Sequence, residues 1–164
     1  MKIFITGIAG FLGCHIAKRM IKLGHSVGGN DNMIGGDRGN LPKEISLFSK
    51  VDCNDYDAMK KAIKGYDLVY HCAATAHEGL SVFSPHTITK NIYGATVSTI
   101  TAAIANKVKR FVYCSSMARY GEQKPPFTED MPTKPVDPYG IAKVAGEETI
   151  SIKELSNLVA NEVG

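Results

Sequence analysis

A tyrosine and a lysine stand four residues apart in the segment Tyr139-Gly140-Ile141-Ala142-Lys143. On a helix this spacing places both side chains on one face, one turn apart. A free tyrosine has a pKa of about 10 and is a poor base at neutral pH, but a nearby ammonium or a positively charged nicotinamide ring favours the phenolate. Such a pair could move a proton on a hydroxyl while a hydride goes to the ring. The alternative is a surface tyrosine and lysine, because this spacing is common by chance.

Two serines and an asparagine could act beside this pair. Ser115 and Ser116 follow the predicted strand 110–115 at its carboxyl end, which is the ligand edge of a parallel sheet. Ser116 could hold the same substrate oxygen as Tyr139. Asn91 is a polar residue on the predicted helix 85–106, and a structural or cofactor role competes evenly with that of an exposed helix residue.

Three glycines near the start of the chain could hold a phosphate group. An apolar run from Lys2 leads into Gly7, Gly10 and Gly13, and an amphipathic helix begins among them. Gly7 would permit the tight turn, Gly10 the close approach of a pyrophosphate, and Gly13 the packing of helix on strand. The helix N-terminus would offer N–H groups to the phosphates. Glycines also occur in ordinary turns, so the glycine spacing alone is weak evidence. The order of strand, glycine turn and helix around it is what favours a dinucleotide site.

An acidic residue follows at the position that selects the dinucleotide. Asp31 ends the predicted strand 26–30, eighteen residues after Gly13. A carboxylate there accepts from the adenosine ribose hydroxyls and repels a 2′-phosphate, which favours NAD over NADP. The alternative is an ordinary aspartate in a turn at the end of a strand. Gly28 and Gly29 have no functional explanation at this stage, since glycine pairs weaken a central strand.

Alternating strands and helices are needed to position these residues. We predict an α/β fold, a three-layer Rossmann domain with helices on both faces of a parallel sheet in the strand order 3-2-1-4-5. The small residues Cys72, Ala73 and Ala74 after the fourth strand would let a cofactor lie against the backbone. The strands are predicted at 2–6, 26–30, 45–51, 67–71 and 110–115, with loops at 32–42, 75–85 and 117–138.

Composition limits the other classes of function. The 164 residues carry 19 Lys and Arg against 16 Asp and Glu, and a net charge of +3 is too small to indicate nucleic acid or a membrane surface. A hydrophobic content of 44% is ordinary for a globular chain. No apolar run approaches membrane-spanning length, and no signal peptide is evident. The four cysteines form no CxxC pair, so we expect reduced thiols in a cytoplasmic protein, with no metal site.

Taken together, these motifs resemble the extended short-chain dehydrogenase/reductase superfamily, in its branch of NAD-dependent sugar-nucleotide epimerases and dehydratases. The resemblance runs to about residue 148 and is closest to enzymes of the UDP-glucose 4-epimerase type. It is carried by TGxxGFLG at 6–13, Asp31-Asn32, Asp52, His71-Cys72-Ala73-Ala74, Asn91, Ser115-Ser116, Tyr120-Gly121 and the Tyr139–Lys143 motif.

The resemblance implies a role for each of these positions. The pyrophosphate would be held by Gly7, Gly10, Phe11, Leu12 and Gly13. Asp31 and Asn32 would hold the ribose, Asp52 and Cys53 the adenine side, and Ala73, Ala74, Asn91 and Ser115 the rest of the cofactor. Tyr139 would be the general base, Lys143 would bind the nicotinamide ribose, and Ser116 would orient the substrate hydroxyl. The substrate would be a nucleotide sugar, most simply a UDP-hexose oxidised transiently at C4, and the helices 85–106 and 138–150 would pair across a homodimer.

The chain departs from the resemblance after residue 148. We predict a NAD-binding domain at 1–148 and a C-terminal segment at 149–164 that is similar to part of the family's substrate domain. This segment is expected to form a short strand at 149–152 and a helix on Leu155, Leu158, Val159 and Val163, as an internal deletion would produce. The alternative is an ordinary continuation of the preceding helix. We also expect the outer edge of the fifth strand to be covered, either by this segment folded back or exchanged between subunits, or by a second copy of the chain.

Two functions therefore remain open at the level of sequence. The first is an NAD-dependent nucleotide-sugar epimerase or dehydratase. The second is an NAD-binding remnant or regulatory module without turnover. The residues of the first are all present, whereas the short C-terminal region favours the second.

Overall fold

The computed structural model describes the backbone of residues 1–162 and the side chains of residues 1–151. The chain forms two compact units. The first, here called the sheet unit, contains Met1–Thr75 and Gly94–Cys114. The second, the helical unit, contains Ala76–Tyr93 and the chain from Ser115 onward. The division into functional domains at residue 148 stays a prediction.

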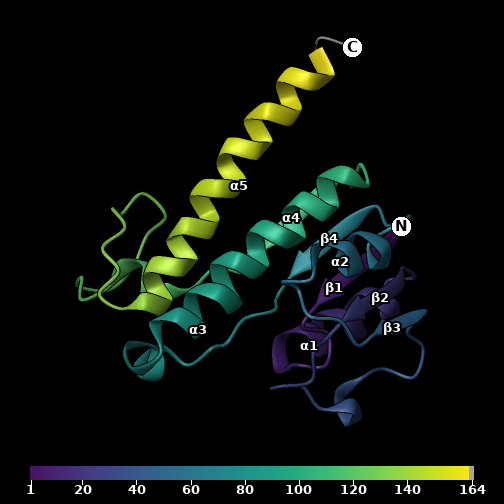
Figure 1. Cartoon of the computed structure of the whole chain (residues 1–164), viewed down its shortest axis with the longest axis horizontal. Helices are drawn as coiled ribbons and strands as arrows, with labels where there is room; N and C mark the ends of the chain where they lie inside the picture. The colour runs from purple at the N-terminus through teal and green to yellow at the C-terminus, as the bar shows by residue number, and fades with distance from the viewer. Residues whose placement is uncertain (163–164) are drawn as a thin grey trace. The chain divides into compact units, whose positions relative to one another are not determined.

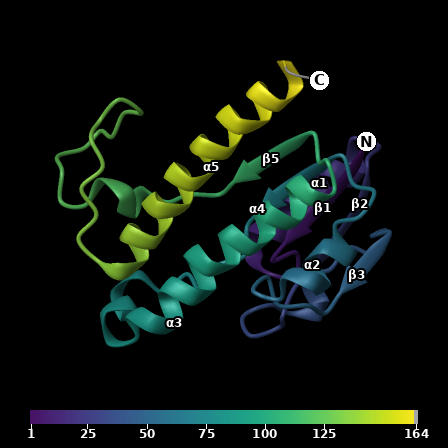
Figure 2. The ribbon, with the colours of Figure 1, turned by 45° about the horizontal axis from the view of Figure 1, so that its top comes forward.

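A five-stranded parallel sheet forms the centre of the sheet unit (Figures 1 and 2). Its order is β3-β2-β1-β4-β5, so the predicted fold class and strand order are confirmed. The edge strands β3 and β5 are shorter than predicted, because each has one neighbouring strand to pair with. The strands are β1 (Lys2–Thr6), β2 (Ser26–Asn30), β3 (Leu47–Ser49), β4 (Leu68–His71) and β5 (Arg110–Tyr113).

Helices cover both faces of this sheet. On one face, α1 (Phe11–Lys22) packs through Ala17 against Ile3 and Ile5 of β1. On the other face, α2 (Tyr56–Ala62) and α4 (Ala95–Ala105) pack against Phe4 and Val69. Because side chains alternate along a strand, the continuous apolar run of β1 supplies both cores, as parallel sheets require. The 3-10 turn η1 (Arg38–Asn40) lies in the loop after β2.

The helical unit consists of short helical turns and one long helix. Its elements are η2 (Glu78–Phe83), α3 (Pro85–Thr89), the π-helical turn η3 (Lys90–Gly94), η4 (Met117–Tyr120) and α5 (Pro138–Glu162). The helix predicted at 85–106 is therefore three consecutive segments, α3, η3 and α4, with a π turn that the sequence pattern did not indicate. The predicted loops 75–85 and 117–138 contain η2 and η4.

The helix α5 continues without interruption from Pro138 to Glu162. The expected strand at 149–152 is therefore wrong, and the alternative of an ordinary helix continuation is confirmed. The expected helix residue Val163 lies outside the described residues. So do the side chains of Leu155, Leu158 and Val159, on which the expected cover of β5 depends.

The glycine pair in β2 has a packing role. A Cβ at Gly29 would collide with the Ile5 carbonyl oxygen and lie 2.9 Å from Ile8 Cβ. A Cβ at Gly28 would collide with the Tyr66 hydroxyl. Glycine is therefore present at these two positions because the side chains of Tyr66 and Ile8 occupy the space that a Cβ would need.

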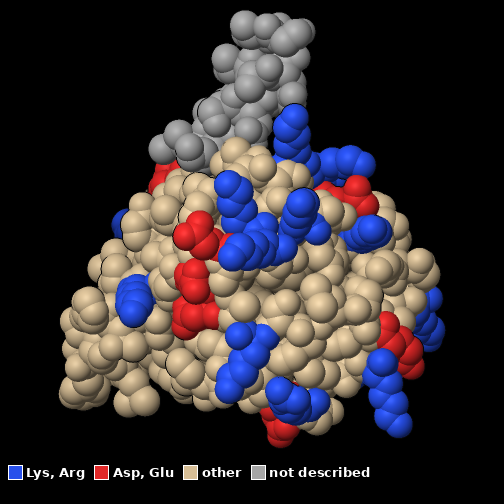
Figure 3. All heavy atoms as spheres, turned by 45° about the vertical axis from the view of Figure 1, so that its right-hand side comes forward, with Lys and Arg blue, Asp and Glu red and all other residues tan. Residues whose placement is uncertain are grey.

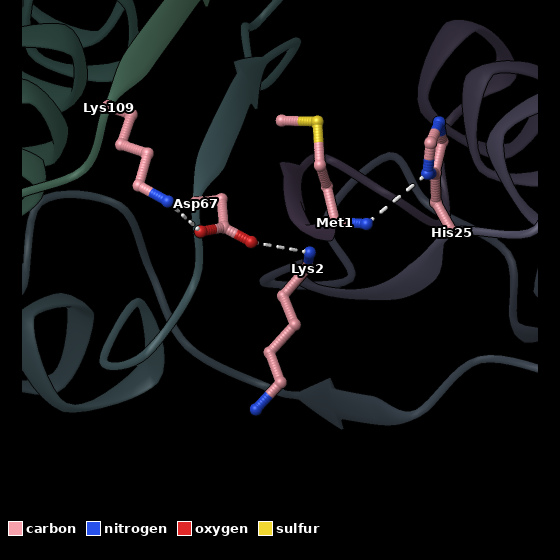
Figure 4. A network of polar contacts seen from close by, with 5 residues as sticks. All are labelled: Met1, Lys2, His25, Asp67 and Lys109. Atoms are coloured by element: carbon pink, nitrogen blue, oxygen red, sulfur yellow. Dashed lines mark hydrogen bonds and ion pairs between the residues drawn. The ribbon is translucent and has the colours of Figure 1, made fainter.

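Asp67 organises the amino ends of three strands (Figure 4). Its Oδ2 accepts from the Lys2 amide at 2.8 Å, its Oδ1 pairs with Lys109 Nζ at 2.9 Å, and its own amide donates to the Lys2 carbonyl. The Lys2 hydrogen bond, followed by that of Lys109, lowers the pKa of Asp67. Nearby, the N-terminal ammonium lies 3.5 Å from His25 Nδ1.

Charged side chains of both signs are interspersed on the face shown in Figure 3.

Among the described residues, no group of three or more His, Cys, Asp or Glu side chains has the arrangement of a metal site. None of the helices, over the part of the chain that is described, combines the length and apolar character needed to cross a bilayer.

The role of Gly29 can be tested by adding one methyl group. We expect Gly29→Ala to lower the free energy of unfolding by about 2–3 kcal/mol, because the new Cβ meets backbone and cannot be accommodated cheaply. Gly35→Ala is the matched control, since a Cβ there has no heavy atom within 4 Å and should change stability by less than about 0.5 kcal/mol. Urea unfolding measures both, and equal stabilities of the two variants would contradict the packing role.

Candidate functional site

The buried hydroxyl of Thr6 joins the carboxyl ends of β1 and β4. Thr6 Oγ1 accepts from the amides of Cys72 and Ala73, both at 3.1 Å, and lies 2.8 Å from His71 Nδ1. Because both acceptor sites of the hydroxyl are occupied by the two amides, its O–H faces His71 Nδ1. The other ring nitrogen, Nε2, lies 3.1 Å from Thr96 Oγ1 of α4.

The glycine turn after β1 is built on this junction. Gly7 has a φ of +66°, and a Cβ there would lie 3.0 Å from the Ala73 backbone, so conformation and space both require glycine. A Cβ at Gly13 would collide with the Gly7 carbonyl oxygen. Gly7 and Gly13 are therefore needed by the fold itself, as predicted from the turn and the helix packing.

Gly10 is less crowded than Gly7 and Gly13. A Cβ there would meet only the Gly7 carbonyl oxygen, at 3.2 Å. Gly10 is also the N-cap of α1, with no side chain bonded to the cap and no acidic residue in the first turn. Phe11 and Leu12, which follow, are 81% and 48% exposed. The first turn of α1 thus presents backbone N–H groups beside a residue that has no side chain, an arrangement that suits an anion.

The carboxylate of Asp31 lies beside this turn at the end of β2. It is buried, and its two oxygens accept from the amides of Ala9 at 3.1 Å and Met33 at 2.8 Å. A Cβ at Gly36 would lie 2.8 Å from this carboxylate. Asp31 therefore fixes the loop after β2 against the glycine turn, and this structural contact had no signal in the sequence beyond its place at a strand end.

Asn32 and Asp52 form the next polar contact along the carboxyl edge. Asn32 Nδ2 donates to Asp52 Oδ2 at 2.9 Å, and Asp52 Oδ1 accepts from the Asn54 amide at 2.8 Å. This contact joins the segments that follow β2 and β3. The two residues predicted to hold the ribose and the adenine side are thus neighbours.

The Cys53 side chain points into the core. It packs with Phe4 and Met59, and Asn30 Nδ2 donates to its sulfur at 3.3 Å. Burial, followed by smaller effects of nearby groups, raises the pKa of the Cys53 thiol to about 11. Any cofactor contact at this position therefore falls to the backbone. Ala73 and Ala74, after β4, are partly buried, and the amide of Ala73 is held by Thr6.

In the helical unit, Tyr139 and Lys143 are both buried on one face of α5. Lys143 Nζ lies 5.8 Å from the centroid of the Tyr139 ring, which confirms the predicted placement one turn apart. Asp137 caps this helix, since its Oδ1 accepts from the Gly140 amide at 2.8 Å. A Cβ at Gly140 would lie 2.8 Å from the Ala118 carbonyl oxygen, so this glycine lets α5 approach η4 closely.

The two serines have separate partners in this unit. Ser115 Oγ donates to Glu147 of α5, and Glu147 also pairs with Arg119 at 3.1 Å. Ser116 is the N-cap of η4, and its Oγ accepts from the Ala118 amide at 3.2 Å. Arg119 and Glu147 were missed in the sequence, although Glu147 lies two turns after Tyr139 on the same helix.

Asn91 lies in the π turn η3 and is partly buried. Single π turns interrupt α-helices frequently at functional sites. The structure therefore places Asn91 at a local irregularity of the backbone, and the choice between a cofactor role and a structural role stays open.

Known proteins with a similar sequence or structure give a consistent picture. Residues 3–154 match the NAD dependent epimerase/dehydratase family. The chain is 34% identical over 154 residues to a UDP-glucose 4-epimerase of Streptomyces lividans and 35% identical over 159 residues to a putative UDP-arabinose 4-epimerase of Arabidopsis thaliana. The crystal structure of the Thermus thermophilus UDP-glucose 4-epimerase in complex with NAD superposes with a TM-score of 0.90 at 30% identity.

These matches cover nearly all of the present chain but only part of each relative. They include 92%, 90% and 95% of this chain, and 46%, 36% and 51% of the Streptomyces, Arabidopsis and Thermus proteins respectively. The chain thus spans about half, or less, of the length of these relatives.

The buried thiol of Cys53 should make stability fall at alkaline pH. The folded pKa of about 11 lies above the ordinary value of 9.0, so the unfolded chain loses this proton first. The contribution of this thiol to the free energy of unfolding is fully present below pH 9. It is lost as the pH rises toward 11, by roughly 2–3 kcal/mol in all. Urea unfolding from pH 8 to 10.5 measures the decline.

The control for this prediction is Cys53→Ala, which has no thiol to ionise. Its stability is expected to be lower at pH 8 but to decline less over the same pH range. Parallel declines for the wild type and Cys53→Ala would show that another group causes the effect.

Proposed function

Because the chain belongs to the NAD dependent epimerase/dehydratase family, we propose that it binds NAD along the carboxyl edge of its sheet and acts on a nucleotide sugar. The observation that carries the proposal is the first turn of α1. Gly7 and Gly13 are required by the packing of the chain, whereas a Cβ at Gly10 would meet a single atom, the Gly7 carbonyl oxygen at 3.2 Å, so the space beside Gly10 is the most open of the three. A pyrophosphate against the α1 amides accounts for that space, since it needs a close approach to the backbone and a helix N-terminus.

The ribose and adenine would lie along the segments after β2 and β3. Asp31 and Asn32 would accept from and donate to the ribose hydroxyls, and Asp52 with the Cys53 backbone would bound the adenine. Ala73 and Ala74 are small enough for the cofactor to lie against the backbone that Thr6 holds. Phe11 and Leu12 would contribute amides to the pyrophosphate through the first turn of α1.

The acid–base chemistry is assigned to the helical unit. NAD, when bound, supplies the acceptor of a hydride. We assign Tyr139 as the base that takes the proton from a sugar hydroxyl and returns it, and Ser116 as the group that orients this hydroxyl. Lys143 would hold the nicotinamide ribose and stabilise the phenolate of Tyr139 by its charge. Ser115 and Asn91 would complete the cofactor contacts.

The relatives named above are epimerases of UDP-glucose and UDP-arabinose. A UDP-hexose is therefore the substrate that we propose, oxidised transiently at its 4-hydroxyl and reduced on the opposite face. NAD binding without turnover is the second candidate. The relatives are epimerases as whole chains, and the present chain matches only about half, or less, of their length.

We also propose a homodimer in the cytoplasm. The helices at 85–106 and 138–150 resemble those that pair across a dimer in the family. All four cysteines are thiols in the structure, which fits a reducing compartment. Light scattering after gel filtration tests the dimer.

Gly10→Val should weaken dinucleotide binding and should disturb the fold less than Gly13→Val does. The valine methyl groups would occupy the space assigned to the pyrophosphate, so the NAD affinity should fall at least about tenfold, equivalent to about 1.4 kcal/mol. Gly13→Val is the contrasting variant, which should lose stability because its Cβ meets the Gly7 carbonyl. Calorimetric titration and thermal unfolding separate the two effects, and unchanged NAD affinity in Gly10→Val would refute the pyrophosphate site.

The carboxylate of Asp31 should discriminate between the two dinucleotides. NADP is expected to bind at least about tenfold more weakly than NAD, since its 2′-phosphate would meet a buried negative charge. Titration of both under identical salt conditions measures the ratio. Equal or tighter binding of NADP would contradict the role given to Asp31.

Tyr139→Phe should separate catalysis from cofactor binding. If the chain turns over UDP-glucose, we expect this variant to lose at least about a hundredfold in rate, because the base is gone, with NAD affinity nearly unchanged. Epimerisation is followed by separating UDP-glucose from UDP-galactose. Undiminished turnover would exclude Tyr139 as the base, and NAD binding without any turnover in the wild type would favour the second candidate.

A further inference from the structure

Two cysteines face each other at the carboxyl ends of neighbouring strands. Cys72 follows β4 and Cys114 follows β5, one position beyond the register pair His71 and Tyr113. The Cys114 amide donates to the His71 carbonyl at 3.1 Å, so the ladder continues to the cysteines. Their sulfur atoms lie 3.5 Å apart. The pair is thus a direct cross-strand contact within the sheet unit.

The backbone spacing at this position suits a covalent link. Neighbouring strands lie about 4.8 Å apart, which falls within the range of about 4.4–6.8 Å between the Cα atoms of disulfide-bonded cysteines. The sulfur atoms lie 3.5 Å apart, and a disulfide bond is about 2.05 Å long. Side-chain rotation must therefore bring the two sulfur atoms closer by about 1.5 Å.

The other two cysteines provide an internal contrast. Cys14 and Cys53 are 2% and 6% exposed, whereas Cys72 and Cys114 are both partly exposed. Cys53 is enclosed by Phe4 and Met59 and bonded to Asn30. Of the four cysteines, the two in contact are thus the less buried ones, although Cys72 also packs against the core around Ile3 and Ile5.

We propose that Cys72 and Cys114 form an oxidative modification site, a dithiol that a peroxide converts to an intramolecular disulfide. One thiolate attacks the peroxide, the O–O bond breaks, and the sulfur becomes a sulfenic acid with loss of water. The second thiol then displaces a second water as the S–S bond forms. Two thiols and one hydrogen peroxide thus give one disulfide and two waters, and a thiol reductant reverses the step by exchange.

The link would brace the edge of the sheet that carries the proposed cofactor contacts. The Cys72 amide is bonded to Thr6 Oγ1, and the next amide, that of Ala73, is bonded to the same oxygen. Because these bonds hold the backbone, oxidation should leave the Gly7 turn in place. The expected consequence is a more stable chain rather than a displaced one.

Intact mass spectrometry of the full chain after a brief treatment with hydrogen peroxide tests the site. We expect the loss of two hydrogen atoms, blockage of two of the four thiols toward N-ethylmaleimide, and a non-reducing peptide map that joins Cys72 to Cys114. Dithiothreitol should restore all four thiols. The oxidised chain should melt roughly 5–10 °C higher than the reduced chain, because the link closes a long loop.

Matched variants make the outcome decisive. Cys14→Ala should still form the link, whereas Cys72→Ala and, independently, Cys114→Ser should lose it while keeping the melting temperature of the reduced wild type within a few degrees. Four thiols that stay reactive after peroxide, stable sulfenic or sulfinic acid without a link, or a disulfide joining two chains or another pair would each overturn the proposal. The test uses no dinucleotide, so it stands or falls separately from the proposed function.

Discussion

One buried hydroxyl, that of Thr6, determines where the carboxyl ends of the two central strands meet. Its oxygen accepts hydrogen bonds from two amides after β4 and lies within hydrogen-bond distance of His71, which extends the contact to Thr96 of α4. The side chains of Thr6, His71 and Thr96 are buried, so each of their polar atoms needs a partner. The Gly7 turn can approach the Ala73 backbone to within contact distance because this junction holds both segments.

The candidate cofactor edge follows from that constraint. With Gly7 and Gly13 packed against backbone, α1 begins directly above the end of β1, and its first turn is left with neither a capping side chain nor an acidic residue. Asp31 then fixes the next loop by accepting the Ala9 amide. The same residues that fold the edge therefore present amides and a carboxylate where the proposed dinucleotide needs them.

Much of this could be predicted from the sequence, because local patterns determine it. The apolar runs at Lys2–Thr6 and Leu68–His71 and the glycine spacing indicated strands, turn and helix without knowledge of distant contacts. The roles of Gly28 and Gly29 could not be predicted, since they depend on Tyr66 and Ile8, which reach them from elsewhere in the chain. The π turn around Asn91 has no periodic signal, and the expected strand after residue 148 is wrong because β-branched residues there continue α5. The pairing of Glu147 with Arg119 and Ser115 likewise depends on tertiary contact.

The central claim is that the first turn of α1 and the end of β2 bind a dinucleotide. A titration of the ¹⁵N-labelled chain with NAD, followed by amide chemical shifts, tests it residue by residue. NAD should produce saturable shifts that are largest at the amides of Gly7–Gly13 and of Asp31 and Asn32. Shifts confined to other parts of the chain, or none at millimolar NAD, would contradict it.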